Sequence, residues 1–102
     1  MAAIDNGAPV NATATHATAA VASVAGVAGA THYITQVSAS SDKAGSILLV
    51  KQGTTVLWQE QVGAGKVDLV FTPPLRAAAG ALISAEIDGT SACKANINGF
   101  TL

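Results

Sequence analysis

The side chains that most often carry out chemistry in proteins are few in this chain and far apart. It has two histidines, His16 and His32, and a single cysteine, Cys93. A zinc site uses three or four such ligands at close spacing, so the sequence predicts no metal centre, and we expect both histidines on the surface or on edge strands. Cys93 alternates with Ala95 and Ile97, which predicts a buried thiol rather than a nucleophile.

The carboxylates form no recognisable catalytic pair either. Hydrolysis of a glycosidic bond needs two carboxyl groups about 5–10 Å apart in a cleft. Five of the acidic residues fall instead in predicted turns or on strand faces that should be solvated: Asp42, Glu60, Asp68, Glu86 and Asp88. No serine stands in a G-x-S-x-G context. We therefore expect a protein that is not an enzyme, with no catalytic residues, no cofactor and no metal.

Two of the aromatic side chains, Trp58 and Tyr33, are of the kind that lines sugar-binding surfaces, because aromatic rings stack on sugars. The chain has only four aromatic residues in all. Large rings supply much of the buried area of a small core, so we expect both rings to be the largest members of the core. An exposed groove that contains either ring is the alternative.

The length of 102 residues predicts one domain with a thin core. Half of the residues are hydrophobic, but 22 of them are alanine. Burying an alanine removes little surface from water, whereas a fully buried Leu, Ile, Val or Phe contributes roughly 1.5–3 kcal/mol. Contacts with neighbouring subunits would therefore help to stabilise such a domain.

The charges exclude several classes of partner. Charged residues make up 11% of the chain and the net charge is −1, so no basic surface is available for nucleic acid or anionic lipid. The apolar tract over residues 17–30 is too short to cross a bilayer. The first lysine is Lys43, which leaves no basic flank for a secretory signal or an anchor. We expect neither a nucleic acid nor a membrane as a partner.

The clearest structural element lies at residues 45–62. Two apolar runs, 46–50 and 54–62, flank Lys51-Gln52-Gly53, and this pattern is typical of a β-hairpin. Apolar residues on both faces of each arm, Trp58 among them, predict a central hairpin that is covered on both sides.

Other segments alternate with the period of a strand. They are residues 10–24 in part, 31–40, 66–72, 81–88 and 91–102. In the segment 31–40 the alternation places Tyr33 and Val37 on one face and His32 and Ile34 on the other. Pro73-Pro74 is expected to end the strand over 66–72. For the alanine-rich residues 17–30 we favour a strand and a glycine turn over a short helix at 19–27.

Short strands at regular spacing predict an all-β fold. We expect a single antiparallel β-sandwich or jelly-roll-like domain of six to eight strands over residues 10–102. Residues 1–9 have no periodicity and include Asn6-Gly7, which is typical of an extended N-terminal arm. Ile4, Pro9 and Val10, in this arm and at the start of the domain, are the candidate partner contacts.

The order of the segments resembles a known family. THYITQVSAS, SILLVKQGTTVLWQ, KVDLVFTPPLRAAAGALISAEI and a closing NINGFTL follow one another over about seventy residues, from Thr31 to Leu102. This order resembles that of small β-sandwich virion proteins of tailed bacteriophages. In those proteins a strand with a His-hydrophobic pair precedes an LxVKDGTTVLW-like hairpin, and a segment like PL…GxAGxAxSAEL precedes a terminal GY or GF strand.

The resemblance implies a structural role and carries over no catalytic residues. It implies a capsid decoration (cement) protein that binds the outer surface of the phage head and stabilises it, or else a fibre or receptor- and glycan-binding module. The implied partners are the major capsid protein and copies of this chain, with a trimer favoured by the symmetry of the shell. The implied location is the virion surface, after synthesis in the bacterial cytoplasm.

Overall fold

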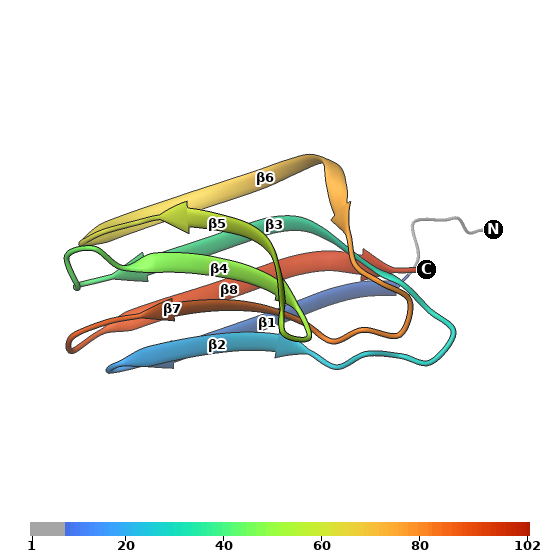
Figure 1. Ribbon diagram of the computed structural model, residues 1–102, viewed down its shortest axis with the longest axis horizontal. Helices are drawn as coiled ribbons and strands as arrows, with labels where there is room; N and C mark the ends of the chain where they lie inside the picture. Colours follow the sequence, from blue (N-terminus) through green and yellow to red (C-terminus); the bar gives the residue numbers. More distant parts are fainter. Residues whose placement is uncertain (1–7) are drawn as a thin grey trace.

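The computed structural model describes residues 8–102, which form eight β-strands (Figure 1). The strands are β1 (Ala8–His16), β2 (Ala19–Val24), β3 (His32–Ser41), β4 (Ile47–Gln52), β5 (Thr55–Gln61), β6 (Gly65–Arg76), β7 (Ile83–Asp88) and β8 (Cys93–Thr101). These residues form no helix, so none of them builds a helical membrane span.

The strands form two four-stranded antiparallel sheets that pack as a sandwich. Sheet A has the order β1-β8-β3-β6, and sheet B has the order β2-β7-β4-β5. In Figure 1 the edge strands β5 and β6 run along the upper side and β1 and β2 along the lower side. The predicted all-β sandwich is confirmed.

The core between the sheets is built from small and branched aliphatic side chains. On the β2 and β7 side it is closed by Ala20, Ala22 and Ala85, and in the middle it is filled by Ile34, Leu48, Ile83 and Ile97, among others. Six of the fourteen buried hydrophobic residues in this core are alanines.

A bulge in β3 makes the predicted faces of this strand wrong. Ile34 pairs with Gly99 of β8 and Gln36 pairs with the next residue, Asn98. One extra residue in β3, Thr35, therefore changes the side of every residue after it. The inward residues are Ile34 before the bulge and Val37 after it, both fully buried. Gln36 then lies on the outer face.

The hairpin of β4 and β5 is confirmed, but its predicted central position is wrong. Its loop is the two-residue pair Gly53-Thr54, with Gly53 at φ +54°, and glycine at the first loop position is the arrangement of a type II′ turn. Strand β4 is internal, whereas β5 is an edge strand with most of its residues exposed.

Strand β6 continues through Pro73-Pro74, against our prediction that the prolines end it. The Thr72–Pro73 peptide bond is cis, and pairing with β3 resumes at Leu75 and Arg76. Proline is tolerated here because β6 is an edge strand and lacks a partner on one side. The chain turns a sharp corner near this point (Figure 1).

The N-terminal region differs in part from the predicted arm. Pro9 and Val10 pair with Phe100 and Gly99 within β1, so these two candidate contacts belong to the sheet. Ile4 lies outside the described residues. In the alanine-rich region, the favoured strand and glycine turn are confirmed as β2 and a turn at Gly29, where φ is +77°.

Candidate functional site

His32 is not a surface residue, contrary to our expectation. It is 2% exposed. Its Nε2 lies 2.8 Å from the carbonyl oxygen of Ala25, and its Nδ1 lies 2.7 Å from the hydroxyl oxygen of Thr101. The imidazole therefore ties the loop after β2 to the end of β8. This side chain holds the fold together and faces no open site.

His16 and Cys93 are neighbours that do not form a catalytic pair. The Cys93 thiol is buried, as predicted, and donates to the backbone carbonyl of His16 over 3.2 Å. The His16 side chain is exposed, and its Nδ1 accepts a hydrogen bond from the backbone N–H of Thr18 at 3.2 Å. Its ring is thus directed at the β1–β2 turn and not at the thiol.

The five carboxylates are each engaged by a neighbour. Asp42 accepts hydrogen bonds from the hydroxyl and N–H of Ser91 and from the N–H of Thr90. The Ser91 hydroxyl and then the Thr90 N–H hold the pKa of Asp42 well below its usual value. Asp88 pairs with Lys43 at 2.6 Å, and this hydrogen bond lowers its pKa.

The remaining carboxylates have structural partners too: Glu86 pairs with Lys51 at 3.0 Å, Asp68 accepts from Gln36 at 2.8 Å, and Glu60 accepts from Trp58 at 3.3 Å. Within residues 8–102 no group of three or more His, Cys, Asp and Glu side chains is placed to hold a metal ion.

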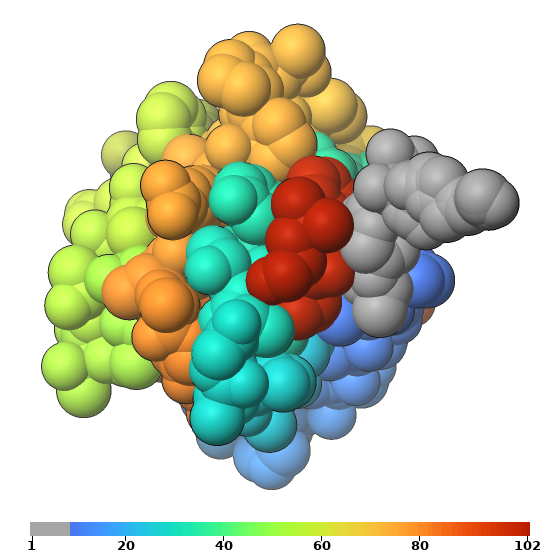
Figure 2. Space-filling model, turned by 90° about the vertical axis from the view of Figure 1, so that its right-hand side faces the viewer, coloured from blue at the N-terminus to red at the C-terminus, as the bar shows by residue number. Residues whose placement is uncertain are grey.

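One end of the sandwich is closed by loops that pack tightly (Figure 2). The loop 25–31 lies against the loop 77–82, where the Gly80 N–H donates to the Ala30 carbonyl at 2.7 Å. A Cβ on Gly26 would come within 2.1 Å of the Gly80 oxygen, so glycine is required there. Figure 2 shows the last residues of the chain beside these loops.

The outer face of sheet B carries aliphatic side chains on both sides of Glu86. Cross-strand pairing aligns Val21, Glu86, Leu49 and Gln59 in one row, with Ile47 in the next. Val21 is 49% exposed and Ile47 is 40% exposed. Together with Leu49 they line a hollow of about 280 Å³. We call the outward side chains of β2, β7, β4 and β5 the apolar face.

The charges on the apolar face are paired. The Lys51–Glu86 and Lys43–Asp88 ion pairs neutralise its acidic groups. A protein that covers this face would therefore contact its aliphatic side chains. It would bury no unpaired charge among the four residues of these two ion pairs.

The outer face of sheet A is polar. A chain of side-chain hydrogen bonds crosses all four strands, because Asn11 donates to Asn98, Asn98 donates weakly to Gln36 at 3.5 Å, and Gln36 donates to Asp68. Asn98 also donates to Asn96 at 2.8 Å. We call the outward side chains of β1, β8, β3 and β6 the polar face.

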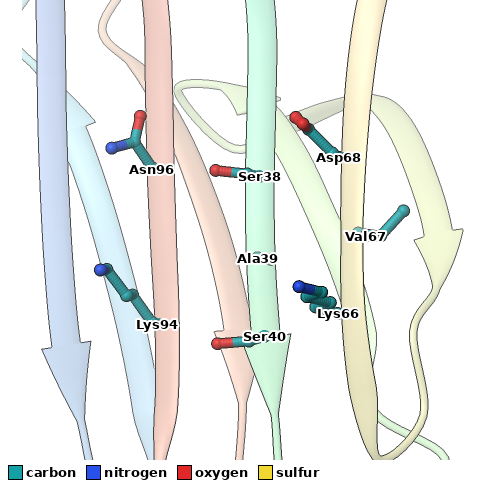
Figure 3. Close-up of a pocket in the computed structure, with 8 residues that line it drawn as sticks. All are labelled: Ser38, Ala39, Ser40, Lys66, Val67, Asp68, Lys94 and Asn96. Carbon is teal, nitrogen blue, oxygen red and sulfur yellow. The ribbon is translucent and has the colours of Figure 1, made fainter.

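The polar face is hollowed over β8, β3 and β6. The hollow has a volume of about 500 Å³. Figure 3 shows Lys94 and Lys66 on either side of Ser40, and Asn96 and Asp68 on either side of Ser38. This arrangement follows from the register, which pairs Ser40 with both lysines. The β3 bulge makes it possible, since it turns these serines outward.

No match is found when the chain is compared with protein-family models, curated proteins and solved structures.

The expectation that Trp58 belongs to the core is wrong. Trp58 is 43% exposed at the edge between β5 and β6, where its ring meets Phe71 edge-on with centroids 5.6 Å apart. A bulge in β5 opposite Val50 and Lys51 lets Leu57 pack on the core beside it, where strict alternation placed Leu57 and Trp58 on opposite faces.

Tyr33 is also outside the buried core. It is partly exposed and stacks on Phe100, with ring centroids 5.0 Å apart. The register of sheet A places Phe100 of β8 between Tyr33 of β3 and Pro9 of β1. Pro9, a predicted partner contact, thus lies next to an aromatic pair.

Proposed function

We propose that this protein is a non-catalytic structural subunit that docks on a larger protein assembly through its apolar face. The observation that carries the proposal is a group of outward aliphatic side chains, the exposed Val21 and Ile47 and the half-buried Leu49, on a sheet whose inner side already forms the core. Contiguous exposed apolar surface on a small domain marks a protein contact site.

The chemistry of the apolar face supports docking by burial. Removing apolar surface from water contributes about 25 cal/mol per Å², and the two ion pairs on this face keep their partners when covered. The Lys51–Glu86 ion pair lies among these aliphatic side chains, so the charge within this part of the surface is already paired.

The assembly we propose is the head of a tailed bacteriophage, with the protein bound to the outer surface of the major capsid protein as a decoration, or cement, subunit. The resemblance over residues 31–102 supports this assignment, and a compact β-sandwich with one apolar face suits the task. Copies that meet around a symmetry axis of the shell would associate as trimers. The protein would then be located at the virion surface.

Binding of the purified full chain to heads that lack it tests the proposal. We expect saturable co-sedimentation at micromolar concentration and a higher temperature of head disruption when the sites are filled. An absence of binding at that concentration, or binding without saturation, contradicts the proposal. Analytical ultracentrifugation of the free chain shows whether the trimer forms before docking.

A fibre or receptor-binding module is the second candidate, and the exposure of Trp58 is the observation that favours it. A ring at an open sheet edge is available to stack on a sugar. Titration of the free chain with host-surface polysaccharide, followed by tryptophan fluorescence, separates the two functions. A saturable shift of the emission that is lost in Trp58→Leu supports the second candidate, and an unchanged emission speaks against it.

A further inference from the structure

We propose that the hollow on the polar face binds an acidic saccharide, with its carboxylate held between Lys66 and Lys94. This proposal is independent of the docking function, because it concerns the opposite side of the sandwich and is tested on the isolated chain. The register aligns the two lysines with Ser40, one on each neighbouring strand. Strands are spaced by about 4.8 Å, so the two lysine backbones are about 10 Å apart across β3.

Lys66 and Lys94 form no ion pair within the described part of the chain. The ion pairs among residues 8–102 involve Lys43 and Lys51, and Lys66 and Lys94 take part in neither. Asp68 lies on the same face, but its Oδ1 accepts from Gln36. Figure 3 shows the Lys66 amino group directed toward Ser40 and the Lys94 amino group directed toward β1. Lys94 is exposed, so rotation of its side chain would let an anionic group over Ser40 gain charge-assisted hydrogen bonds from both lysines.

The second row of the hollow favours a saccharide over a simple anion. This second row lies two residues further along the strands, about 7 Å from the first. It consists of Asn96, Ser38 and Asp68. The hydroxyl of Ser38 and the second oxygen of Asp68 have no hydrogen-bond partner among the described residues. A ligand that fits both rows carries a negative group at one end and hydroxyl donors at the other, as a uronic acid residue does.

The lining of the hollow disfavours nucleic acid. Its six polar side chains include no aromatic ring on which a base could stack. A volume of about 500 Å³ lies within the range of small-ligand sites. Because the hollow is shallow and polar, we expect affinity in the millimolar range.

The test is a titration of the ¹⁵N-labelled full chain with trigalacturonate, monitored by amide chemical shifts. Maltotriose serves as the neutral saccharide and an oligothymidylate as the phosphate polyanion. We expect saturable shifts at Ser38, Ser40, Lys66 and Lys94 with trigalacturonate and none with maltotriose. Lys66→Gln and Lys94→Gln should each weaken binding about tenfold, whereas Lys43→Gln, on the other side of the sandwich, should leave it unchanged.

Ser40→Asp keeps the test decisive if a lysine variant folds poorly. It places a carboxylate between the two lysines, where opposite charges on neighbouring strands attract, so the variant should fold and should bind no trigalacturonate. The proposal is overturned by an absence of shifts at millimolar ligand, by equal binding of maltotriose, or by undiminished binding to Ser40→Asp. Oligothymidylate binding as tight as trigalacturonate binding also overturns it, in favour of a general polyanion site.

Discussion

The two outer faces of the sandwich differ although both are built on four antiparallel strands. On the polar face, amide and hydroxyl side chains bond to one another across every strand. On the apolar face, exposed aliphatic side chains lie beside two ion pairs. A sheet with one side on the core normally turns polar residues to water. The polar face largely follows this rule, with Val70 as an exposed exception, whereas the apolar face turns Val21 and Ile47 to water. This contrast is the basis for our proposal that the apolar face docks on a partner.

Placing the same charge on each face tests most directly whether the two faces differ in function. Ile47→Lys on the apolar face should weaken binding to phage heads on the order of 100-fold, because a buried unpaired ammonium is costly and central interface residues dominate affinity. Val70→Lys is the matched control, since Val70 is 72% exposed on the outer side of sheet A. It should leave binding intact. Equal losses in the two variants would mean that the faces do not differ in function.

The polar face depends on the β3 bulge, and Gly99 is the residue that permits it. A Cβ on Gly99 would lie 1.9 Å from the Tyr33 carbonyl oxygen. Gly99→Ala should therefore lower the free energy of unfolding by about 3 kcal/mol, since backbone atoms must shift. Urea denaturation measures the loss. Gly65→Ala is the control, because its Cβ would meet only the Val62 oxygen at 4.0 Å; a similar loss in both variants would refute the steric explanation.

The hydrogen-bonded network should contribute more to stability than the ion pairs do. Asn98 contacts three neighbours, Asn11, Asn96 and Gln36, so Asn98→Ala should cost about 1 kcal/mol. Lys51→Gln breaks one partly exposed ion pair and should cost about 0.5 kcal/mol. Salt should reduce only the second effect. If Lys51→Gln lowers the free energy of unfolding more than Asn98→Ala does, the ion pair contributes more than the network, contrary to this prediction.

The smallest effect concerns pH. The pKa values of Asp88 and Asp42 are lowered in the folded chain, so these groups stabilise it above their unfolded pKa, near 4, and this contribution is lost as the pH falls toward their folded values. Thermal unfolding between about pH 5 and pH 2 should show this decline. Asp88→Asn and Asp42→Asn should each flatten it, while Asn98→Ala should keep the full slope.

Much of the fold is predictable from alternation alone. The inward residues of β6, β7 and β8 fall where a period of two places them, including Leu69 and Ile97. The failures occur at bulges, where one extra residue reverses the pattern. The bulge in β3 left no signal in the sequence of β3 itself. The signal was Gly99 in β8, because a glycine inside a strand is typical of a close approach by a neighbouring backbone. In β5, the apolar run around Leu57 and Trp58 suggested a central strand, but a bulge and an open edge explain it.

The candidate surfaces were not predictable in the same way. Lys66 and Lys94 lie on different strands and meet over Ser40 only through the register of sheet A. Val21 and Leu49 are brought together by β7, which lies between their strands. His32 was misplaced because its two hydrogen-bond partners lie in a loop and at the end of β8, which no local pattern records.

Electron microscopy of phage heads that carry this protein tests the central claim most directly. The map should place the outward side of β2, β7, β4 and β5 against the capsid shell, with Ile47 and Val21 in the contact and the polar face turned to solvent. A map in which the polar face lies on the shell, or in which heads supplied with the protein show no added density, would contradict it.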